Sequence, residues 1–244
     1  MEISVIIPAY NEERIIRNSI KSIIAYMREN FKSYEIIVVD DGSTDKTPEI
    51  LREFSGEIRI LTNTKNMGKG YCVKKGVMYA TGDKIVFTDA DMAYPKKYIK
   101  EFSKVLDTTD MVIGKRDSVR SAYPFYRRLM SNALSYANKL LFQNIPSDTQ
   151  CGLKGFRNKT AKSIFDRCTI NRFGFDIETI CIANLLGKSI REYSVHMTSY
   201  EKSTVNPVTA PYKILSDIAK IKLNLITGYY TKYAIVHESF GRLT

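Results

Sequence analysis

The first half of this chain alternates between short apolar runs and amphipathic segments. Runs rich in β-branched residues occur at Ile3–Ile7, Glu35–Val39, Ile58–Leu61, Lys84–Thr88 and Met111–Ile113. Helical spacing of apolar residues occurs between them, at about Glu12–Arg28, Pro48–Phe54, Gly70–Tyr79 and Lys96–Leu106. Continuous apolar strands separated by such helices are typical of a mostly parallel sheet covered on both faces. The pattern predicts a doubly wound, Rossmann-like α/β fold with flanking helices.

The second half is less regular. We expect helices at Phe125–Phe142, Lys159–Arg167 and Ile177–Leu186, and a strand at Ser189–Met197. A last amphipathic helix is expected at about Tyr212–Tyr230. One side of it would carry Ile214, Leu215, Ile218, Ile221, Leu225 and Ile226, and Lys213, Lys220 and Lys222 lie among the rest. This helix would either pack on the domain or lie in a membrane interface.

Polar segments follow the predicted strands at the edge where doubly wound sheets bind ligands. Asp89 and Asp91 end the fourth run and would point to the same side of a strand. Carboxylates are ligands that Mg²⁺ or Mn²⁺ shares with substrate phosphates. The pair is therefore a candidate clamp for a metal–diphosphate, with an ordinary surface loop as the alternative.

Two more of these segments suit a nucleotide. One carboxylate of Asp40 and Asp41 would accept hydrogen bonds from a base N–H or a ribose hydroxyl, although Thr47-Pro48 also reads as a helix start. Asn66–Gly70, with Gly68, would bring backbone N–H groups near an anion or simply form a tight turn. It lacks the spacing of a Walker loop.

The net charge of +11 lies entirely after Asp91. Residues 1–91 have a net charge of −1 and residues 92–244 of +12. Such a bias indicates an anionic partner, which would be a phosphorylated substrate, a nucleic acid or an acidic membrane surface, or else a solvated basic surface.

Other features of the composition indicate the cellular compartment of the protein. Four cysteines without a CxxC pair indicate reduced thiols in a cytosolic protein, and two histidines cannot build a multi-histidine metal site. We expect no signal peptide, because the chain begins with a strand-like run, and no apolar stretch reaches membrane-spanning length.

Four segments together resemble the signatures of family 2 inverting glycosyltransferases of GT-A fold. They are Pro8–Glu12, Asp40–Asp45, Asn66–Gly70 and Asp89–Asp91. Four downstream segments resemble the polyprenyl-phosphate branch of that family, which transfers mannose or glucose to dolichyl phosphate. They are Gly114–Arg116, Phe125–Arg128, Asp148–Phe156 and Phe175–Glu178. The resemblance covers about residues 3–205.

The resemblance implies a role for each matching position. Pro8, Tyr10, Glu12 and one of Asp40 and Asp41 would line the nucleotide pocket, with Gly68, Lys69 and Ala90 beside the donor. Asp89 and Asp91 would hold the metal–diphosphate, and Arg116 and Arg127 the lipid phosphate. The donor would be UDP-glucose or GDP-mannose, and the metal Mg²⁺ or Mn²⁺.

Two positions depart from the mannose synthases. Ala93 stands where a metal-binding glutamine is common, and Lys202 stands near the place of an arginine. The segments Asp148–Gly152 and Phe175–Glu178 resemble those of the glucosyltransferases more than those of the mannose synthases.

The chemistry can be considered without the family. A metal would stabilise the leaving diphosphate. A phosphate acceptor, with its second pKa near 6, is already a nucleophile at pH 7, so arginines rather than a base become important. Asp148 would position the acceptor, serve as a residual base or be a turn residue. Lys69 and Lys154 would steady phosphates or be solvated, and solvation is favoured for Lys154.

Three functions compete on these grounds. The first is a hexosyltransferase acting on polyprenyl phosphate, peripheral on the cytoplasmic face of a membrane. The second is a glycosyltransferase that extends a glycan or other non-lipid acceptor. The third, a nucleic-acid-binding module, lacks the basic–aromatic runs or recognition helix it needs, so we expect no nucleic-acid partner. We expect a catalytic domain over residues 1–210 and a helical segment over 211–244. The domain would comprise a nucleotide-sugar half, 1–91, and an acceptor half, 92–210.

Overall fold

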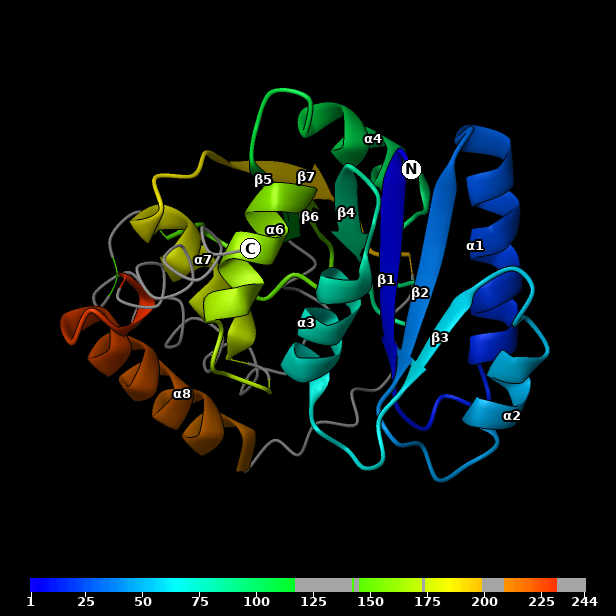
Figure 1. Ribbon diagram of the computed structural model, residues 1–244, viewed down its shortest axis with the longest axis horizontal. Coiled ribbons are helices and arrows are strands. Elements are labelled where there is room, and N and C mark those ends of the chain that lie inside the picture. The colour runs from blue at the N-terminus through cyan, green and yellow to red at the C-terminus, as the bar shows by residue number, and fades with distance from the viewer. Residues whose placement is uncertain (117–141, 143–144, 173, 199–208, 232–244) are drawn as a thin grey trace, which may run out of the picture.

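A seven-stranded sheet with the strand order β3-β2-β1-β4-β6-β5-β7 forms the centre of the protein in a computed structural model (Figure 1). The structure describes residues 1–116, 142, 145–172, 174–198 and 209–231, with the side chains of 209–214 left out. The elements in chain order are β1 (Ile3–Ala9), α1 (Ile16–Asn30), β2 (Tyr34–Asp40), α2 (Thr47–Arg52), β3 (Arg59–Thr62), α3 (Lys69–Tyr79), β4 (Lys84–Phe87), α4 (Lys97–Val105), β5 (Met111–Arg116), β6 (Lys154–Arg157), α6 (Asn158–Arg167), α7 (Phe175–Leu185), β7 (Ile190–Val195) and α8 (Thr209–Ile226).

The sheet is mostly parallel, which confirms the predicted fold class. β1 pairs in parallel with β2 and β4, β2 with β3, and β5 with β7. β6 is the exception, because it runs antiparallel to both of its neighbours, β4 and β5. The sequence did not predict β6, and this strand joins the two halves of the sheet.

Helices cover both faces of the sheet and divide the core in two (Figure 1). Alternate residues of β1 show the division, since Ile3, Val5 and Ile7 pack with α1, α2 and α4, whereas Ile6 packs with α3, α6 and α7. All of these strand residues are buried. Burial on both faces explains why the strands are continuous apolar runs.

The predicted elements of the first half are confirmed with small shifts of their ends. The largest shift is at α1, which begins at Ile16 and not at Glu12. The carbonyl of Glu12 accepts the N–H groups of Ile15 and Ile16, so the preceding residues form a turn. In the second half, the helix expected over Phe125–Phe142 lies outside the described residues, apart from Phe142.

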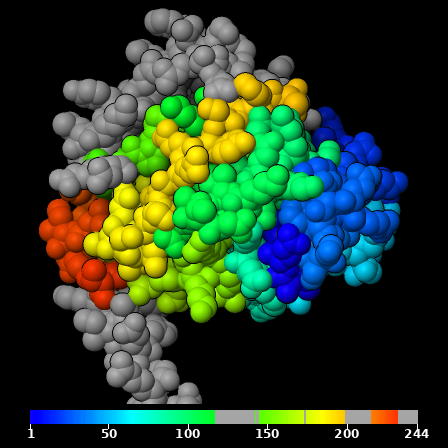
Figure 2. Space-filling model, turned by 90° about the horizontal axis from the view of Figure 1, so that it is seen from above, coloured from blue at the N-terminus to red at the C-terminus, as the bar shows by residue number. Residues whose placement is uncertain are grey.

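The C-terminal helix α8 packs on the α3–α6–α7 side of the core. Ile218 and Ile221 are buried there, whereas Leu215, Leu223 and Ile226 are exposed. The expectation of a single apolar side was therefore wrong, because the apolar residues divide between a buried and an exposed face. In the space-filling view, the end of α8 (red) and the N-terminal part of the chain (blue) lie on opposite sides of the described residues (Figure 2). No helix in the described ranges is long and apolar enough to cross a bilayer.

A buried carboxylate connects α7 to the C-terminal segment. Glu178 is fully buried and accepts hydrogen bonds from Thr169 N, Thr169 Oγ1, Ile170 N and the hydroxyl of Tyr230, at 2.8 to 2.9 Å. Tyr230 is itself fully buried just after α8. Four donors compensate the cost of burying this charge.

This arrangement predicts unequal effects of two substitutions. Glu178→Leu leaves two backbone N–H groups without an acceptor, so the free energy of unfolding should fall by about 3 kcal/mol or more. Tyr230→Phe removes one donor of four and should cost about 1 kcal/mol. Urea unfolding followed by circular dichroism measures both, and equal losses would contradict a central role for Glu178.

Candidate active site

The loops that follow β1 and β2 form one hydrogen-bonded unit at the carboxyl edge of the sheet. Asn11 N donates to Ser43 Oγ at 2.9 Å, and Thr44 N donates back to Asn11 Oδ1 at 2.8 Å. Glu12 N donates to Thr47 Oγ1 at 2.8 Å. Thr47 therefore ties the two loops together rather than simply starting α2. Pro8 is the second-to-last residue of β1, which ends at Ala9, and Tyr10 is exposed beside this unit.

Asp40 and Asp41 are both buried, but they point to different partners. Asp41 accepts hydrogen bonds from Met67 N, Gly68 N and the side chain of Asn63, each at 2.8 Å. It therefore fixes the loop that leads into α3. Asp40 accepts one from Ser43 N at 3.1 Å, and its other oxygen has no hydrogen-bond partner among the described residues. Of the two, Asp40 is the carboxylate that remains open to a ligand.

A pocket of about 530 Å³ lies beside Asp40, between α2 and the ends of β2 and β3. Its lining includes Asp40, Ser43, Thr44, Arg52 and Thr62. The lining offers carboxylate and hydroxyl groups as acceptors and an arginine as a donor, a combination that suits the edge of a nucleobase or a ribose.

Asp89 and Asp91 lie in a turn and not in β4, which ends at Phe87. Met92 N donates to the carbonyl of Asp89 at 3.2 Å, and Met92 has a positive φ of 50°. The argument from strand alternation was therefore wrong, although the two carboxylates still share a neighbour. Ala90 between them is buried, so its side chain faces the core and not a ligand.

Lys69 is the shared neighbour of the two aspartates. Its Nζ lies 2.5 Å from Asp89 Oδ1. Burial opposes the charge of Lys69, but Asp89, Asp176 and Asp91 outweigh it and raise the pKa of Lys69. Lys69 is the first residue of α3, next to Gly68 with a φ of 103°. An ammonium group thus stands beside both candidate metal ligands.

Ala93 supplies no side-chain ligand at the position where a glutamine was considered. It is buried in the apolar cluster under α4, and its carbonyl accepts the N–H of Thr198 at 2.9 Å. Asp91 Oδ1 accepts the N–H of Ala93 at 3.1 Å. In the described part of the chain, no group of three or more His, Cys, Asp or Glu side chains is placed to hold a metal. Asp89 and Asp91 remain the candidate ligands, and carboxylate oxygens suit Mg²⁺ or Mn²⁺.

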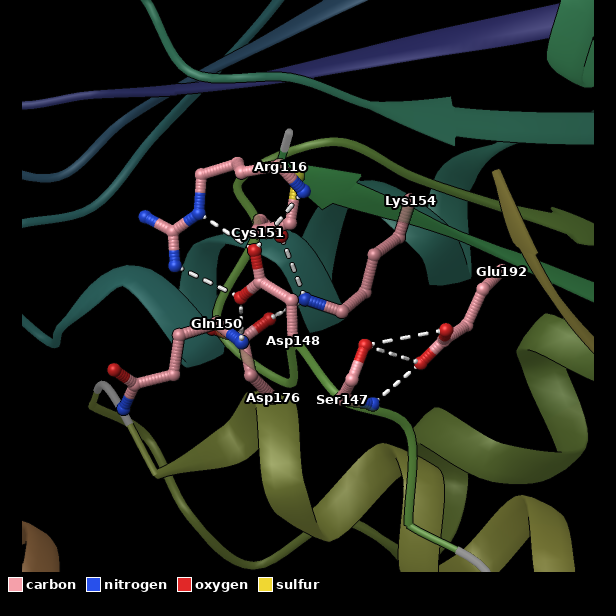
Figure 3. Close-up of polar contacts among 8 residues, drawn as sticks. All are labelled: Arg116, Ser147, Asp148, Gln150, Cys151, Lys154, Asp176 and Glu192. Atoms are coloured by element: carbon pink, nitrogen blue, oxygen red, sulfur yellow. Dashed lines mark hydrogen bonds and ion pairs between the residues drawn. The ribbon is translucent and has the colours of Figure 1, made fainter. Parts of the chain in front are cut away.

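Arg116 and Asp148 form a bidentate ion pair, with the two side chains pointing toward each other (Figure 3). Arg116 Nε and Nη2 donate to the two carboxylate oxygens at 2.6 and 2.8 Å, and Arg116 N also donates to Asp148. Burial disfavours the charge of Asp148, but Arg116 outweighs it and lowers the pKa of Asp148. A general base at neutral pH needs a shift in the opposite direction. The geometry thus favours positioning over proton transfer for Asp148.

Lys154 is fully buried, so the expectation that it is solvated was wrong. Lys154 is the first residue of β6, and its Nζ contacts Asp176 of α7 (Figure 3). The same Nζ donates a hydrogen bond to the carbonyl of Cys151, in the loop before β6, at 2.7 Å. Burial raises the pKa of Asp176, and Lys154 and Lys69 oppose that shift. Asp176 was not predicted as a site residue, because its partner lies 22 positions earlier in the chain.

The sequence of this chain is similar to those of known proteins. Residues 4–165 match the family Glycosyl transferase family 2. The chain belongs to this family. It is therefore a glycosyltransferase. It is 32% identical to dolichyl-phosphate β-glucosyltransferase of Dictyostelium discoideum, over 93% of this chain and 76% of that protein. It is 28% identical to the protein of that name from Homo sapiens, with the same coverage.

The fold of this glycosyltransferase has a solved counterpart. Glucosyl-3-phosphoglycerate synthase from Mycobacterium tuberculosis, crystallised with Mn²⁺, UDP and phosphoglyceric acid, superposes with a TM-score of 0.70. The alignment covers 91% of this chain and 78% of that one at 19% identity. This likeness confirms the predicted GT-A type of α/β fold.

Some expected site residues of the glycosyltransferase lie outside the described residues. They are Arg127 and Lys202. Within the described residues, the structure brings Lys69, Asp89, Asp148 and Arg116 to one edge of the sheet and adds Lys154 and Asp176. The proximity of Asp148–Phe156 to Phe175–Glu178 could not be read from spacing, because it depends on β6.

Gly152 allows the loop before β6 to approach the metal-binding candidate. A Cβ at this position would overlap Asp89 Oδ2, a side-chain atom that can move away. Gly152→Ala should therefore leave folding nearly intact but displace Asp89, weakening the binding of UDP or GDP with Mn²⁺ about tenfold. Isothermal titration calorimetry measures this affinity.

Gly56→Ala provides the matched control, because no atom lies within 4 Å of a Cβ built at Gly56. The control should bind the metal–nucleotide as the wild type does. Unchanged affinity in Gly152→Ala would show that Asp89 does not hold the metal–diphosphate in the position described.

Proposed function

We propose that this glycosyltransferase moves glucose from UDP-glucose to dolichyl phosphate or another polyprenyl phosphate, with inversion and with Mg²⁺ or Mn²⁺. The observation that carries the proposal is the Arg116–Asp148 pair near the Lys69–Asp89 pair. It supplies an arginine and a carboxylate of low pKa, but no base tuned for neutral pH. The curated relatives named above carry the same activity in their names.

A phosphate acceptor fits this ion pair, because a phosphate does not need a general base to become a nucleophile. A phosphate monoester is already largely ionised at pH 7, so it attacks without losing a proton to the enzyme. The acceptor phosphate must instead approach a second anion, the donor diphosphate, which repels it. Arg116 keeps one nitrogen, Nη1, without a hydrogen-bond partner among the described residues. This nitrogen is suited to a phosphate oxygen while Asp148 holds the guanidinium in place. Arg127 is proposed as a second phosphate ligand.

The donor is proposed to bind across the loops that follow β1 to β4. Pro8, Tyr10, Glu12 and Asp40 would line the nucleoside site, while Asp41 holds the loop of Gly68 rather than touching the ligand. Lys69 and the N–H groups at the start of α3 would face the diphosphate. A divalent metal on Asp89 and Asp91 would supply charge for the leaving diphosphate.

We propose glucose rather than mannose for two reasons. Ala93 stands where mannose synthases commonly have a glutamine, and the relatives are named glucosyltransferases. Ala93 is packed in the core, so the metal shell would be completed by donor phosphates and water. GDP-mannose remains the competing donor. In this proposal residues 1–91 bind the donor, residues 92–210 bind the acceptor, and residues 211–244 form a helical appendage.

We propose that α8 also contacts the membrane that carries the acceptor. Leu215, Leu223 and Ile226 are exposed, whereas Ile218 and Ile221 are buried, and Ile226 is 74% exposed. Exposed apolar side chains of this kind, near lysines, favour an interfacial location. The four buried, free cysteines agree with a reducing compartment and thus with the cytoplasmic face.

The transfer reaction is tested with labelled donors. UDP-[³H]glucose, Mg²⁺ or Mn²⁺ and polyprenyl phosphate should give an organic-extractable glycolipid, and GDP-[³H]mannose should give at least tenfold less. Asp91→Ala should reduce the rate by about 10² or more, because the leaving group loses its metal. Glucose transfer to a water-soluble acceptor alone would overturn the lipid assignment.

The membrane contact is tested without disturbing the buried side of α8. Leu223→Ser with Ile226→Ser should weaken binding to phosphatidylcholine–phosphatidylserine vesicles about tenfold, because two apolar side chains no longer enter the interface. Met78→Ser with Tyr79→Ser, on exposed residues of α3, is the control and should bind normally. Vesicle flotation measures binding, and equal losses in both variants would exclude a specific role for α8.

A further inference from the structure

Six charged side chains form three neighbouring ion pairs at the site and below it. In spatial order they are Arg116, Asp148, Lys154, Asp176, Lys69 and Asp89. Three contacts in this order are ion pairs, namely Arg116–Asp148, Lys154–Asp176 and Lys69–Asp89. The pairs also act on one another, since Lys154 lies close enough to stabilise the charge of Asp148, and Lys69 that of Asp176.

Exposure increases from the middle of this group of side chains to its ends. The side chains of Lys154 and Asp176 are 0% and 6% exposed. Those of Arg116 and Asp89 at the ends are 31% and 32% exposed. The ends are therefore accessible to substrates, whereas the central pair is sealed from water.

The central lysine contacts both sides of the site. Its Nζ donates to the carbonyl of Cys151, in the loop that also contains Asp148 and Gly152. The same atom lies 5.5 Å from the ring centroid of Phe87, the last residue of β4 before Asp89. Lys154 thus links the loop of Asp148 to the strand that presents Asp89, and Asp176 fixes Lys154 to α7 (Figure 3).

A buried ion pair is a poor means of stabilising a fold, because well-packed apolar side chains of similar volume often do as well or better. We propose that Lys154 and Asp176 form a positioning pair that fixes Asp148, on the acceptor side, relative to Asp89, on the donor side. This inference rests on the proposed function, which assigns those two sides. Neither residue needs to touch a substrate.

The test replaces the pair by apolar residues, in the double variant Lys154→Met with Asp176→Leu. Its melting temperature should equal or exceed that of the wild type. Its kcat for glucosyl transfer should fall at least tenfold, since small errors in the approach of reactants are costly. The affinity for UDP with Mn²⁺, measured by calorimetry, should change less than threefold. A folded double variant with wild-type kcat would overturn the proposal.

The control removes an ion pair at the other end of β4. Lys84 Nζ lies 2.5 Å from Asp107 Oδ1, at the amino end of that strand. Lys84→Met with Asp107→Leu should retain kcat. If the apolar variant of the central pair does not fold, Asp176→Asn replaces it, because the amide keeps an acceptor that supports folding but removes the charge that holds Lys154. It should show the same loss of kcat with unchanged nucleotide affinity.

A crystal structure of the double variant gives a readout independent of the reaction. The proposal expects the separation of Asp148 and Asp89 to change, and an unchanged separation would overturn it. If the wild type transferred no sugar to lipid, the proposed function would fail. The crystallographic comparison would still decide whether the pair positions these two carboxylates.

Discussion

Backbone N–H groups at the carboxyl edge of the sheet need acceptors, and buried carboxylates provide them. Asp41 accepts two N–H groups from the loop before α3, Glu178 two from the segment after α6, and Asp148 that of Arg116. Buried N–H groups without acceptors are expensive, so each carboxylate selects one conformation of its loop. The positions of Lys69, which follows the loop held by Asp41, and of Arg116, whose N–H Asp148 accepts, depend on acceptors of this kind.

The regular part of the fold was accessible from sequence because its signals are local. Strands buried on both faces appear as continuous apolar runs, and α3 and α4 show their spacing directly. β6 was missed because Lys154-Gly155-Phe156-Arg157 has one large apolar residue and two basic ones. A lysine in a central strand requires a buried acid to neutralise it, and Asp176 occupies a distant position in the sequence.

The sequence predicted which residues form the site better than it predicted which partners those residues contact. Loop motifs identified Asp40, Asp41, Asp89 and Asp91, but not that Asp41 is occupied by backbone donors and that Asp40 is open. Three basic residues near the site are each paired with an acid. The excess of 12 positive charges after Asp91 therefore resides elsewhere in the second half. Long-range attraction of anions and local stabilisation of charge are consequently tasks of different residues.

The hydrogen bond between Tyr230 and Glu178 affects the order in which parts of the protein become stable during synthesis. Glu178 holds Thr169 and Ile170, and the next residue, Asn171, accepts the N–H of Tyr71 at 3.0 Å near the start of α3. Support for a donor-side loop made early thus comes from a tyrosine 52 positions after Glu178. On the ribosome, the seven described strands are all present once β7 has emerged, but this loop acquires its full support only after Tyr230 has emerged.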